Sequence, residues 1–257
     1  MPAFVPAAAR TLHLFEVFAE TRREMSNAEI AKALGVPETS SLDLLHTLLQ
    51  RGYLVRTPRS RRFYPTSRLL AVAAVIAGKD PLLAASGEVL EILRDETGET
   101  TICAQLRDHH VEVLDVREGT HELRCMLPVG RRMAMHASAV GKALLAEMGA
   151  QSAGTLIGTK PLKAVTPHSV TDPVKLMTQL RAAQRQGMAE TQDEGTEGVA
   201  AMAVAGRIGD QLVAFSIFGP TERLKRQRVA YRKALLRAKE LAFGVEDAPV
   251  EKVAAPS

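Results

Sequence analysis

The chain has 257 residues, of which 46% are hydrophobic and 24% are charged. These values are ordinary for a globular protein of one or two domains, and they exclude a disordered or collagen-like chain. The formal net charge of +4 permits an acidic partner. Two cysteines without a Cys-x-x-Cys spacing argue against a disulfide framework, and the N-terminus lacks the pattern of a signal peptide. The apolar run at residues 69–78 is half the length of a membrane span, which needs roughly twenty residues. We therefore expect a cytoplasmic protein with no membrane segment.

Residues 1–66 are predicted to form three short helices and a β-hairpin. In the first helix, the apolar side chains near one face are Leu12, Phe15, Val17 and Phe18. The second helix begins with the Ser-x-x-Glu pattern of a capping box at residues 26–29 and ends at Gly35, a residue type that tolerates the left-handed cap. Pro37 suits the first turn of the third helix, and residues 53–65 alternate about a turn. This order is that of a winged helix-turn-helix domain.

The third helix begins without positive charge at the end that would approach DNA bases. Its first turns carry Glu38 and Asp43 but no lysine or arginine, whereas residues 51–68 hold six arginines and no acid. We therefore expect the wing to supply affinity and the hydroxyls at the helix start to supply selectivity. The alternative is a small helical domain with a solvated basic turn. The candidate DNA-binding residues are Arg10, Ser26, Asn27, Glu38, Thr39, Ser40, Ser41, Leu42, His46, Arg56, Arg59, Arg61 and Arg62.

The rest of the chain predicts a linker helix and an α+β domain. Residues 67–80 read as an apolar linker helix. It is too apolar to lie exposed, so we expect it to be either part of the core or a dimer contact. Residues 81–247 alternate between strand and helix patterns, which indicates an antiparallel sheet flanked by helices. We expect strands at 100–108, 110–118, 122–130 and twice within 198–220, and helices at 82–98, 136–148, 172–187 and 221–243. Residues 248–257 have no periodicity and are predicted to be disordered.

Five stretches carry a resemblance to a known family. They are "MSNAEIAKALGVPETSSLDLLHTLLQRGYL" (25–54), "DETGETT" (95–101), "LPVGRRMAMHASAVGKALLA" (127–146), "GMAETQDEGTEGVAAMAVAG" (187–206) and "LVAFSIFGP" (212–220). With them the chain resembles the IclR family of bacterial transcription regulators over nearly its whole length. The resemblance implies a winged helix-turn-helix DNA reader, a linker helix and a GAF-like effector-binding domain. It also implies a homodimer or a dimer of dimers that represses or activates catabolic genes by binding double-stranded operator DNA.

The resemblance also places an effector site, in which three positions depart from family members that bind small oxo-acids. Thr191 stands where those members have Asp, Ala201 where they have Cys, and Phe218 where they have Ser. The site should therefore be less polar, which favours an aromatic acid over a two- or three-carbon acid. Its carboxylate would meet backbone N–H groups at the helix start, residues 136–138. The candidate effector-binding residues are Met133, Ser138, Ala139, Val140, Thr191, Ala201, Ser216 and Phe218.

Enzyme and metal interpretations have weaker support in the sequence. "AVGKAL" lacks the spacing of a phosphate-binding loop, since His136 and Ala143 occupy positions that need Gly and Ser or Thr. A Cys103–His136 hydrolase lacks a third group. The basic closing helix is either a second nucleic-acid surface or, as we favour, a solvated face. We expect no cofactor, no metal and no enzyme; the alternative is a small-molecule enzyme or sensor with an accessory basic domain. Cysteine and histidine residues that match no common zinc spacing are Cys103, His109, His110, His121 and Cys125.

Overall fold

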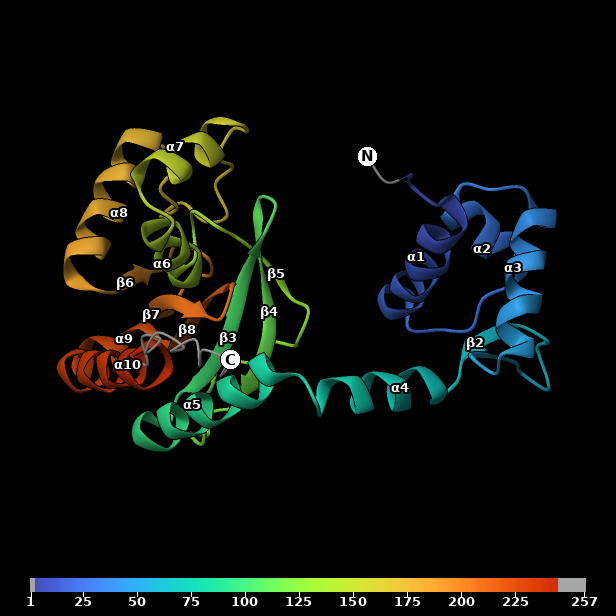
Figure 1. The fold of residues 1–257 in the computed structure, drawn as a ribbon, viewed down its shortest axis with the longest axis horizontal. Coiled ribbons are helices and arrows are strands. Elements are labelled where there is room, and N and C mark those ends of the chain that lie inside the picture. The colour runs from blue at the N-terminus through green and yellow to red at the C-terminus, as the bar shows by residue number, and fades with distance from the viewer. Residues whose placement is uncertain (1–2, 245–257) are drawn as a thin grey trace, which may run out of the picture. The chain divides into compact units, whose positions relative to one another are not determined.

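The computed structural model describes residues 3–244, which form two compact units (Figure 1). The boundary between the units falls between Lys79 and Asp80, next to the predicted end of the linker at residue 80. The tail predicted to be disordered, residues 248–257, lies outside the described residues. No single helix in residues 3–244 is both long and apolar enough to cross a membrane.

The first unit contains four helices and a two-stranded hairpin within its described residues. These elements are α1 (Pro6–Thr21), α2 (Asn27–Leu34), α3 (Glu38–Gln50), β1 (Leu54–Arg56), β2 (Phe63–Pro65) and α4 (Arg68–Ala77). Its core forms where Leu14, Val17 and Phe18 of α1 pack against α2, α3 and the hairpin. The prediction that Leu12 shares a helical face with Val17 and Phe18 is wrong, because Leu12 is 68% exposed whereas the other two are buried. The spacing of 14, 17 and 18 follows the helical period, and Leu12 lies outside it.

Local signals fix the ends of α2 as predicted. Ser26 Oγ accepts a hydrogen bond from Glu29 N, and Glu29 Oε2 accepts one from Ser26 N at 2.8 Å, so both halves of the capping box are present. Gly35 ends the helix with a φ of 65°. The wing is then attached by a β-bridge between Met25 and Phe63, which holds the hairpin against the start of α2.

The second unit is an antiparallel sheet of six strands in the order β5-β4-β3-β8-β7-β6. In this order β3 lies between β4 and β8, so residues near 100 lie beside residues near 217 although they are far apart in the sequence. This is the predicted α+β class with an antiparallel sheet and helices. Its elements are α5 (Pro81–Thr97), β3 (Thr100–Arg107), β4 (His110–Arg117), β5 (Arg132–Ala134), α6 (Ala139–Glu147), α7 (Ala150–Gly158), α8 (Pro173–Gln186), β6 (Ala189–Gln192), β7 (Val199–Ile208), β8 (Gln211–Pro220), α9 (Thr221–Arg226) and α10 (Arg228–Phe243).

Helices cover both faces of this sheet, because its central strands are apolar on both sides. Ile102 and Ala104 of β3 point into a core shared with α6, α7 and α8, whereas Cys103 between them points into a core shared with α5, α9 and α10. Figure 1 shows these two helical layers with the sheet between them. In β8 the same alternation sends Phe218 to the first core and Phe215 to the second.

Two expectations about the second unit need correction. The strand predicted at 122–130 is wrong: that segment has no regular structure, and the strand that pairs with β4 is β5 instead. Pro128 offers no N–H for a ladder there. The closing helix is not continuous, because Gln227, with φ −98° and ψ 9°, separates α9 from α10. In addition, α7 and the edge strand β6 were not predicted.

Candidate functional site

The polar edge of α3 is the first candidate site. The helical period carries Leu45 and Leu48 into the core and leaves the opposite side in solvent. This edge carries no lysine or arginine, as the sequence predicted. The exposed residues of the edge are Glu38, Thr39, Ser40, Asp43 and His46.

The prediction that Ser41 contacts DNA is contradicted by its position. Ser41 is 0% exposed, and its Oγ has no hydrogen-bond partner within the described part of the chain. It lies one helical turn before Leu45 and therefore points into the core. Leu42, also predicted, is half-buried beside it. Of the hydroxyls predicted to contact DNA at the start of α3, those of Thr39 and Ser40 are exposed.

The wing arginines divide into two that serve the fold and two that are free. Arg62 Nη1 lies 3.0 Å from Glu29 Oε2, which ties the wing to the capping box of α2. Arg56 stacks on Phe63, with its guanidinium carbon 5.0 Å from the ring centre. Arg59 and Arg61 are exposed and make no ion pair with the described residues. Both guanidinium groups are therefore accessible to a partner outside the described chain.

Two other residues predicted to contact DNA, Ser26 and Asn27, make hydrogen bonds within the helix-turn-helix. Asn27 Nδ2 donates to the carbonyl oxygen of Glu38 at 3.0 Å, which joins the first residues of α2 and α3. The Ser26 oxygen is engaged in capping α2. Arg10 on α1 is exposed, as the prediction requires. Ser26 and Asn27 therefore fix the start of α2 and its position relative to α3.

The second candidate site is a cavity of about 320 Å³ between the sheet and the start of α6. All eight predicted effector residues line it, although they come from different elements and the turns beside them. Residues 125–127, Val165, Gly195, Thr196 and Val199 complete part of the wall. The eight are Met133, Ser138, Ala139, Val140, Thr191, Ala201, Ser216 and Phe218.

Strand pairing builds the floor of the cavity. Thr191 on β6 pairs with Ala201 on β7, which pairs with Phe218 on β8, so the three lie in one row. Ser216 lies two residues from Phe218 on the same face. Its Oγ donates to the carbonyl oxygen of Met202 at 2.8 Å, so this hydroxyl already has a partner. Thr191 brings the remaining hydroxyl of the row.

The start of α6 closes one end of the cavity. Ser138 is the N-cap: its Oγ accepts from Gly141 N at 3.2 Å and donates to the Ala134 carbonyl oxygen at 2.8 Å. The helix therefore begins after residues 136–138, and the N–H groups without a partner in the described chain are those of Ala139 and Val140. Gly141 is required, because a Cβ there would lie 2.1 Å from the Met135 carbonyl oxygen.

Two arginines in the wall were not predicted. Arg131 and Arg132 line the cavity, are exposed and make no ion pair with the described residues. They lie in and just before β5, in a stretch without periodicity, so their spacing carried no signal. A repeated Arg-Arg beside a predicted pocket was the available clue. Both place positive charge in the cavity wall.

The described residues do not form the arrangements that the enzyme and metal alternatives require. Among the described residues, no group of three His, Cys, Asp or Glu could hold a metal ion. Burial raises the pKa of the Cys103 thiol to about 12, and this residue lies in the core with α5 and α10. His136 Nε2 instead lies 3.0 Å from the carbonyl oxygen of Lys163. Burial also raises the pKa of the Cys125 thiol in the cavity wall.

Comparison with known proteins matches most of the chain to two domains of one family. The IclR helix-turn-helix domain matches residues 7–58, and the family described as bacterial transcriptional regulator IclR C-terminal matches residues 75–242. The Transcriptional repressor IclR of Escherichia coli strain K12 is 29% identical over 93% of this chain and 90% of its own.

Solved structures show the same fold. An IclR regulator from Alicyclobacillus acidocaldarius superposes with a TM-score of 0.78 at 24% identity, over 93% of this chain and all of that one. An IclR homolog from Microbacterium hydrocarbonoxydans, complexed with 4-hydroxybenzoate, gives 0.71 at 23% identity, over 90% of this chain and 99% of its own.

A winged helix-turn-helix unit joined to an α+β unit with a ligand-sized cavity defines the class of effector-binding, DNA-binding transcription regulators. The chain belongs to the IclR family of bacterial transcriptional regulators, which is a family of regulators and not of enzymes.

Proposed function

We propose that this regulator responds to an aromatic acid and controls genes for the use of that acid. The observation that carries the proposal is the composition of the cavity wall. Its lining contains two arginines, Arg131 and Arg132, and no aspartate or glutamate. An anion is therefore favoured over a neutral or cationic ligand.

The shape of the ligand follows from the apolar part of the wall. A ring beside Phe218 would gain buried area and an aromatic contact, with about 0.5–1.5 kcal/mol from the ring pair alone. A two- or three-carbon acid would leave polar groups unmatched, at roughly 1–3 kcal/mol for each buried hydrogen bond not made. A carboxylate on the ring would meet an arginine or the N–H groups of Ala139 and Val140, and Thr191 would take a ring hydroxyl.

The Microbacterium homolog supports the choice of 4-hydroxybenzoate as the first ligand to test, since that protein was solved with it. Footprinting of the DNA upstream of this protein's own gene is the test of the whole function. Protection of a salt-sensitive site that changes when an aromatic acid is added is the expected result. Protection that no aromatic acid alters would contradict the proposed effector class.

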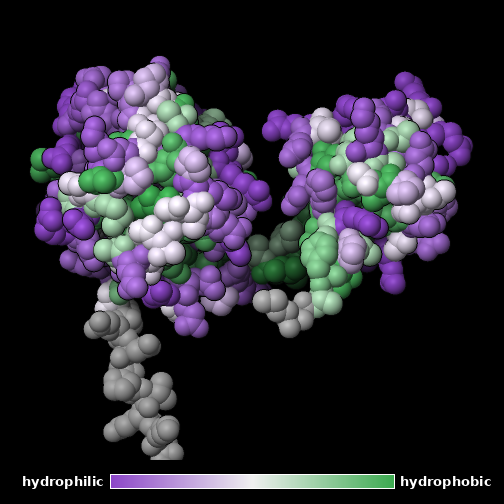
Figure 2. Space-filling model, turned by 90° about the horizontal axis from the view of Figure 1, so that it is seen from above, coloured by the Kyte–Doolittle hydropathy of each residue, from purple (hydrophilic) through white to green (hydrophobic). Residues whose placement is uncertain are grey.

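We further propose that the protein is a homodimer joined through α4, with two copies of α3 reading a pseudo-palindromic operator. The support is the surface of α4. Its apolar side chains are exposed, and the stretch that joins the two units is coloured hydrophobic in Figure 2. A second copy would cover them. These side chains include Leu69, Leu70, Val72, Val75 and Ile76.

A further inference from the structure

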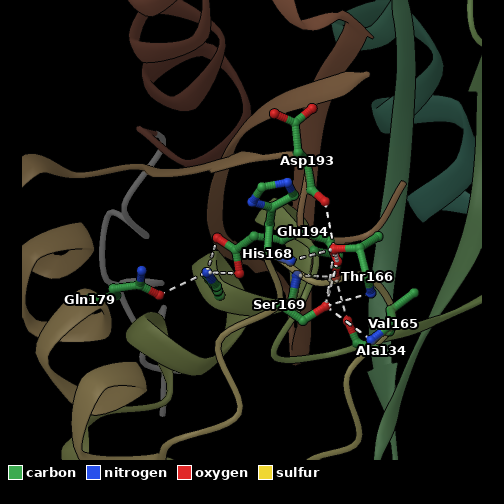
Figure 3. A network of polar contacts seen from close by, with 11 residues as sticks. Ala134, Val165, Thr166, His168, Ser169, Gln179, Asp193 and Glu194 are labelled. Carbon is green, nitrogen blue, oxygen red and sulfur yellow. Dashed lines mark hydrogen bonds and ion pairs between the residues drawn. The ribbon is translucent and has the colours of Figure 1, made fainter. Parts of the chain in front are cut away.

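Glu194 lies at the turn between β6 and β7, where its neighbours form part of the cavity wall. Its carboxylate accepts hydrogen bonds from Lys142 Nζ at 2.5 and 2.7 Å (Figure 3). The Lys142 side chain is 2% exposed and the Glu194 side chain 8%, so the pair is buried. Lys142 Nζ also donates to Gln179 Oε1 at 2.8 Å. The side chain of Glu194 thus bonds its turn to α6, and through Lys142 to α8.

The main chain of Glu194 bonds the same turn to a third segment of the wall. Its carbonyl oxygen accepts from Ser169 Oγ at 2.7 Å and from Thr166 Oγ1 at 3.1 Å. Ser169 Oγ also accepts from the N–H of Val165, which lines the cavity. Figure 3 shows these hydroxyls gathered around the turn. Glu194 is therefore the point where three cavity-lining segments are tied together.

The turn has little freedom to move without changing the cavity. A Cβ added at Gly195, which lines the cavity, would lie 2.9 Å from the carbonyl oxygen of Ala137. The turn thus contacts the residues that lead into α6. A shift of the turn would move Gly195 and Thr196 against the ligand and would loosen the entry to α6.

Stability alone does not account for the buried ion pair. Burial lowers the pKa of Lys142, which shows that removing its charge from water is costly. A buried pair of this kind is often replaced by packed apolar residues with no loss of stability. A pair that joins ligand-lining segments has a second use, because two charged groups fix direction and distance more narrowly than apolar contact does.

We propose that Glu194 is a positioning residue of the effector site, and that its ion pair with Lys142 sets the geometry of the cavity. Glu194 does not touch the ligand in this proposal; it acts through Gly195, Thr196 and the start of α6. The proposal rests on the cavity being the effector site and is independent of whether the effector is aromatic.

The test uses the full chain with the double substitution Lys142→Met and Glu194→Met, which removes both charges and keeps volume. Hydrogen exchange is measured on peptides covering residues 163–170 and 190–199, with calorimetry against 4-hydroxybenzoate. Glu96→Gln is the matched control, since it breaks a pair with Arg237 between α5 and α10, away from the cavity. We expect about tenfold faster exchange in both peptides, about tenfold weaker binding, and an unchanged midpoint of thermal unfolding. The control should change neither exchange in these peptides nor binding.

Ser169→Ala provides a second route that leaves both charges in place. It removes one anchor of the Glu194 carbonyl and should speed exchange at 190–199 to a smaller extent. Wild-type exchange rates in both variants would overturn the proposal, as would faster exchange with unchanged ligand affinity. Faster exchange in a protein whose wild type binds no aromatic acid would uphold the positioning role and refute only the proposed effector class.

Discussion

Adjacent residues at the start of α3 have opposite environments. Ser40 is exposed, whereas Ser41 is 0% exposed with a hydroxyl that has no partner among the described residues. A buried hydroxyl without a hydrogen bond costs free energy of folding, while an exposed one is solvated at no cost. Of the two serines, therefore, Ser41 belongs to the core and Ser40 is accessible to a partner.

Ser41→Ala should raise the stability of the first unit by about 1 kcal/mol, because it removes an unmet buried hydroxyl and places the best helix former in α3. Operator affinity should stay at the wild-type value. Ser40→Ala is the matched control and should leave the unfolding temperature nearly unchanged while reducing selectivity. Differential scanning calorimetry and DNA titration check the two effects. A less stable Ser41→Ala protein would mean that the hydroxyl has a partner after all.

Glu29 links α2 to the wing through its ion pair with Arg62. Titration of its carboxylate should change the free energy of unfolding. The N–H of Ser26, followed by Arg23, lowers the pKa of Glu29 from 4.5 to about 2. Because the folded-state pKa is the lower one, this group stabilises the fold above about pH 4.5, and that contribution is lost as pH falls from 4.5 towards 2.

Glu29→Gln should therefore be less stable than wild type at pH 7, with a difference that shrinks on acidification. Thermal unfolding at intervals from pH 7 to pH 3 measures it. Glu20→Gln, which removes a charge from the exposed face of α1, is the control for net charge. A stability difference between the wild type and the Glu29→Gln variant that stays constant over this range would contradict the assigned role of the carboxylate.

At the scale of the elements, the expected division of DNA binding between the wing and α3 can be tested by changing each one separately. Replacing the free arginines, with Arg59→Gln and Arg61→Asn together, should weaken binding to operator and random DNA alike. The logarithmic salt slope should fall by up to about 0.9 for each phosphate that the wing no longer neutralises. Asparagine suits position 61, where φ is 54°.

Thr39→Ala with Ser40→Ala is the complementary change on α3. It should leave the salt slope as it is and narrow the ratio between operator and random affinity. Fluorescence anisotropy at several salt concentrations measures both quantities. If the arginine pair altered selectivity alone, the division of tasks between wing and helix would be wrong.

The sequence predicted those elements whose signals are local. The capping box at Ser26 and Glu29, and the glycine at 35, mark α2 within a few residues, and the turn at Gly209 and Asp210 marks the hairpin of β7 and β8. The position of β5 depends on pairing between Val111 and Met133, which no local pattern encodes. The break at Gln227 contains neither glycine nor proline, so no local pattern in the sequence indicates it.

The candidate site was predictable to a similar degree. Family resemblance named eight residues that the fold gathers around one cavity, because most lie on strands and a helix with regular spacing. Arg131 and Glu194 were not predicted as residues of the site, because both lie in irregular segments whose geometry depends on long-range contacts. Ser41 was misplaced, although its spacing from Leu45 and Leu48 already indicated the core.

On the scale of the whole molecule, α4 should determine assembly. Leu70 is 72% exposed and Ile76 67%, so a single copy leaves an apolar surface in water. Leu70→Glu should give a folded monomer with poor operator affinity, because one recognition helix then binds one half-site. Val174→Glu is the matched control: Val174 on α8 is 76% exposed and should tolerate the charge. Sedimentation measures both variants, and a dimeric Leu70→Glu protein would place the interface elsewhere.

The most direct measurement of the central claim is calorimetric titration of the full-length protein with 4-hydroxybenzoate, benzoate, pyruvate and glyoxylate. The cavity wall, with Phe218 at its floor and Arg131 and Arg132 at its side, predicts micromolar-range binding of the aromatic acids and little heat from the other two. Phe218→Ser should weaken the aromatic ligands and leave ligand-free DNA binding nearly intact. Tight binding of pyruvate or glyoxylate, with no heat from either aromatic acid, would contradict the account.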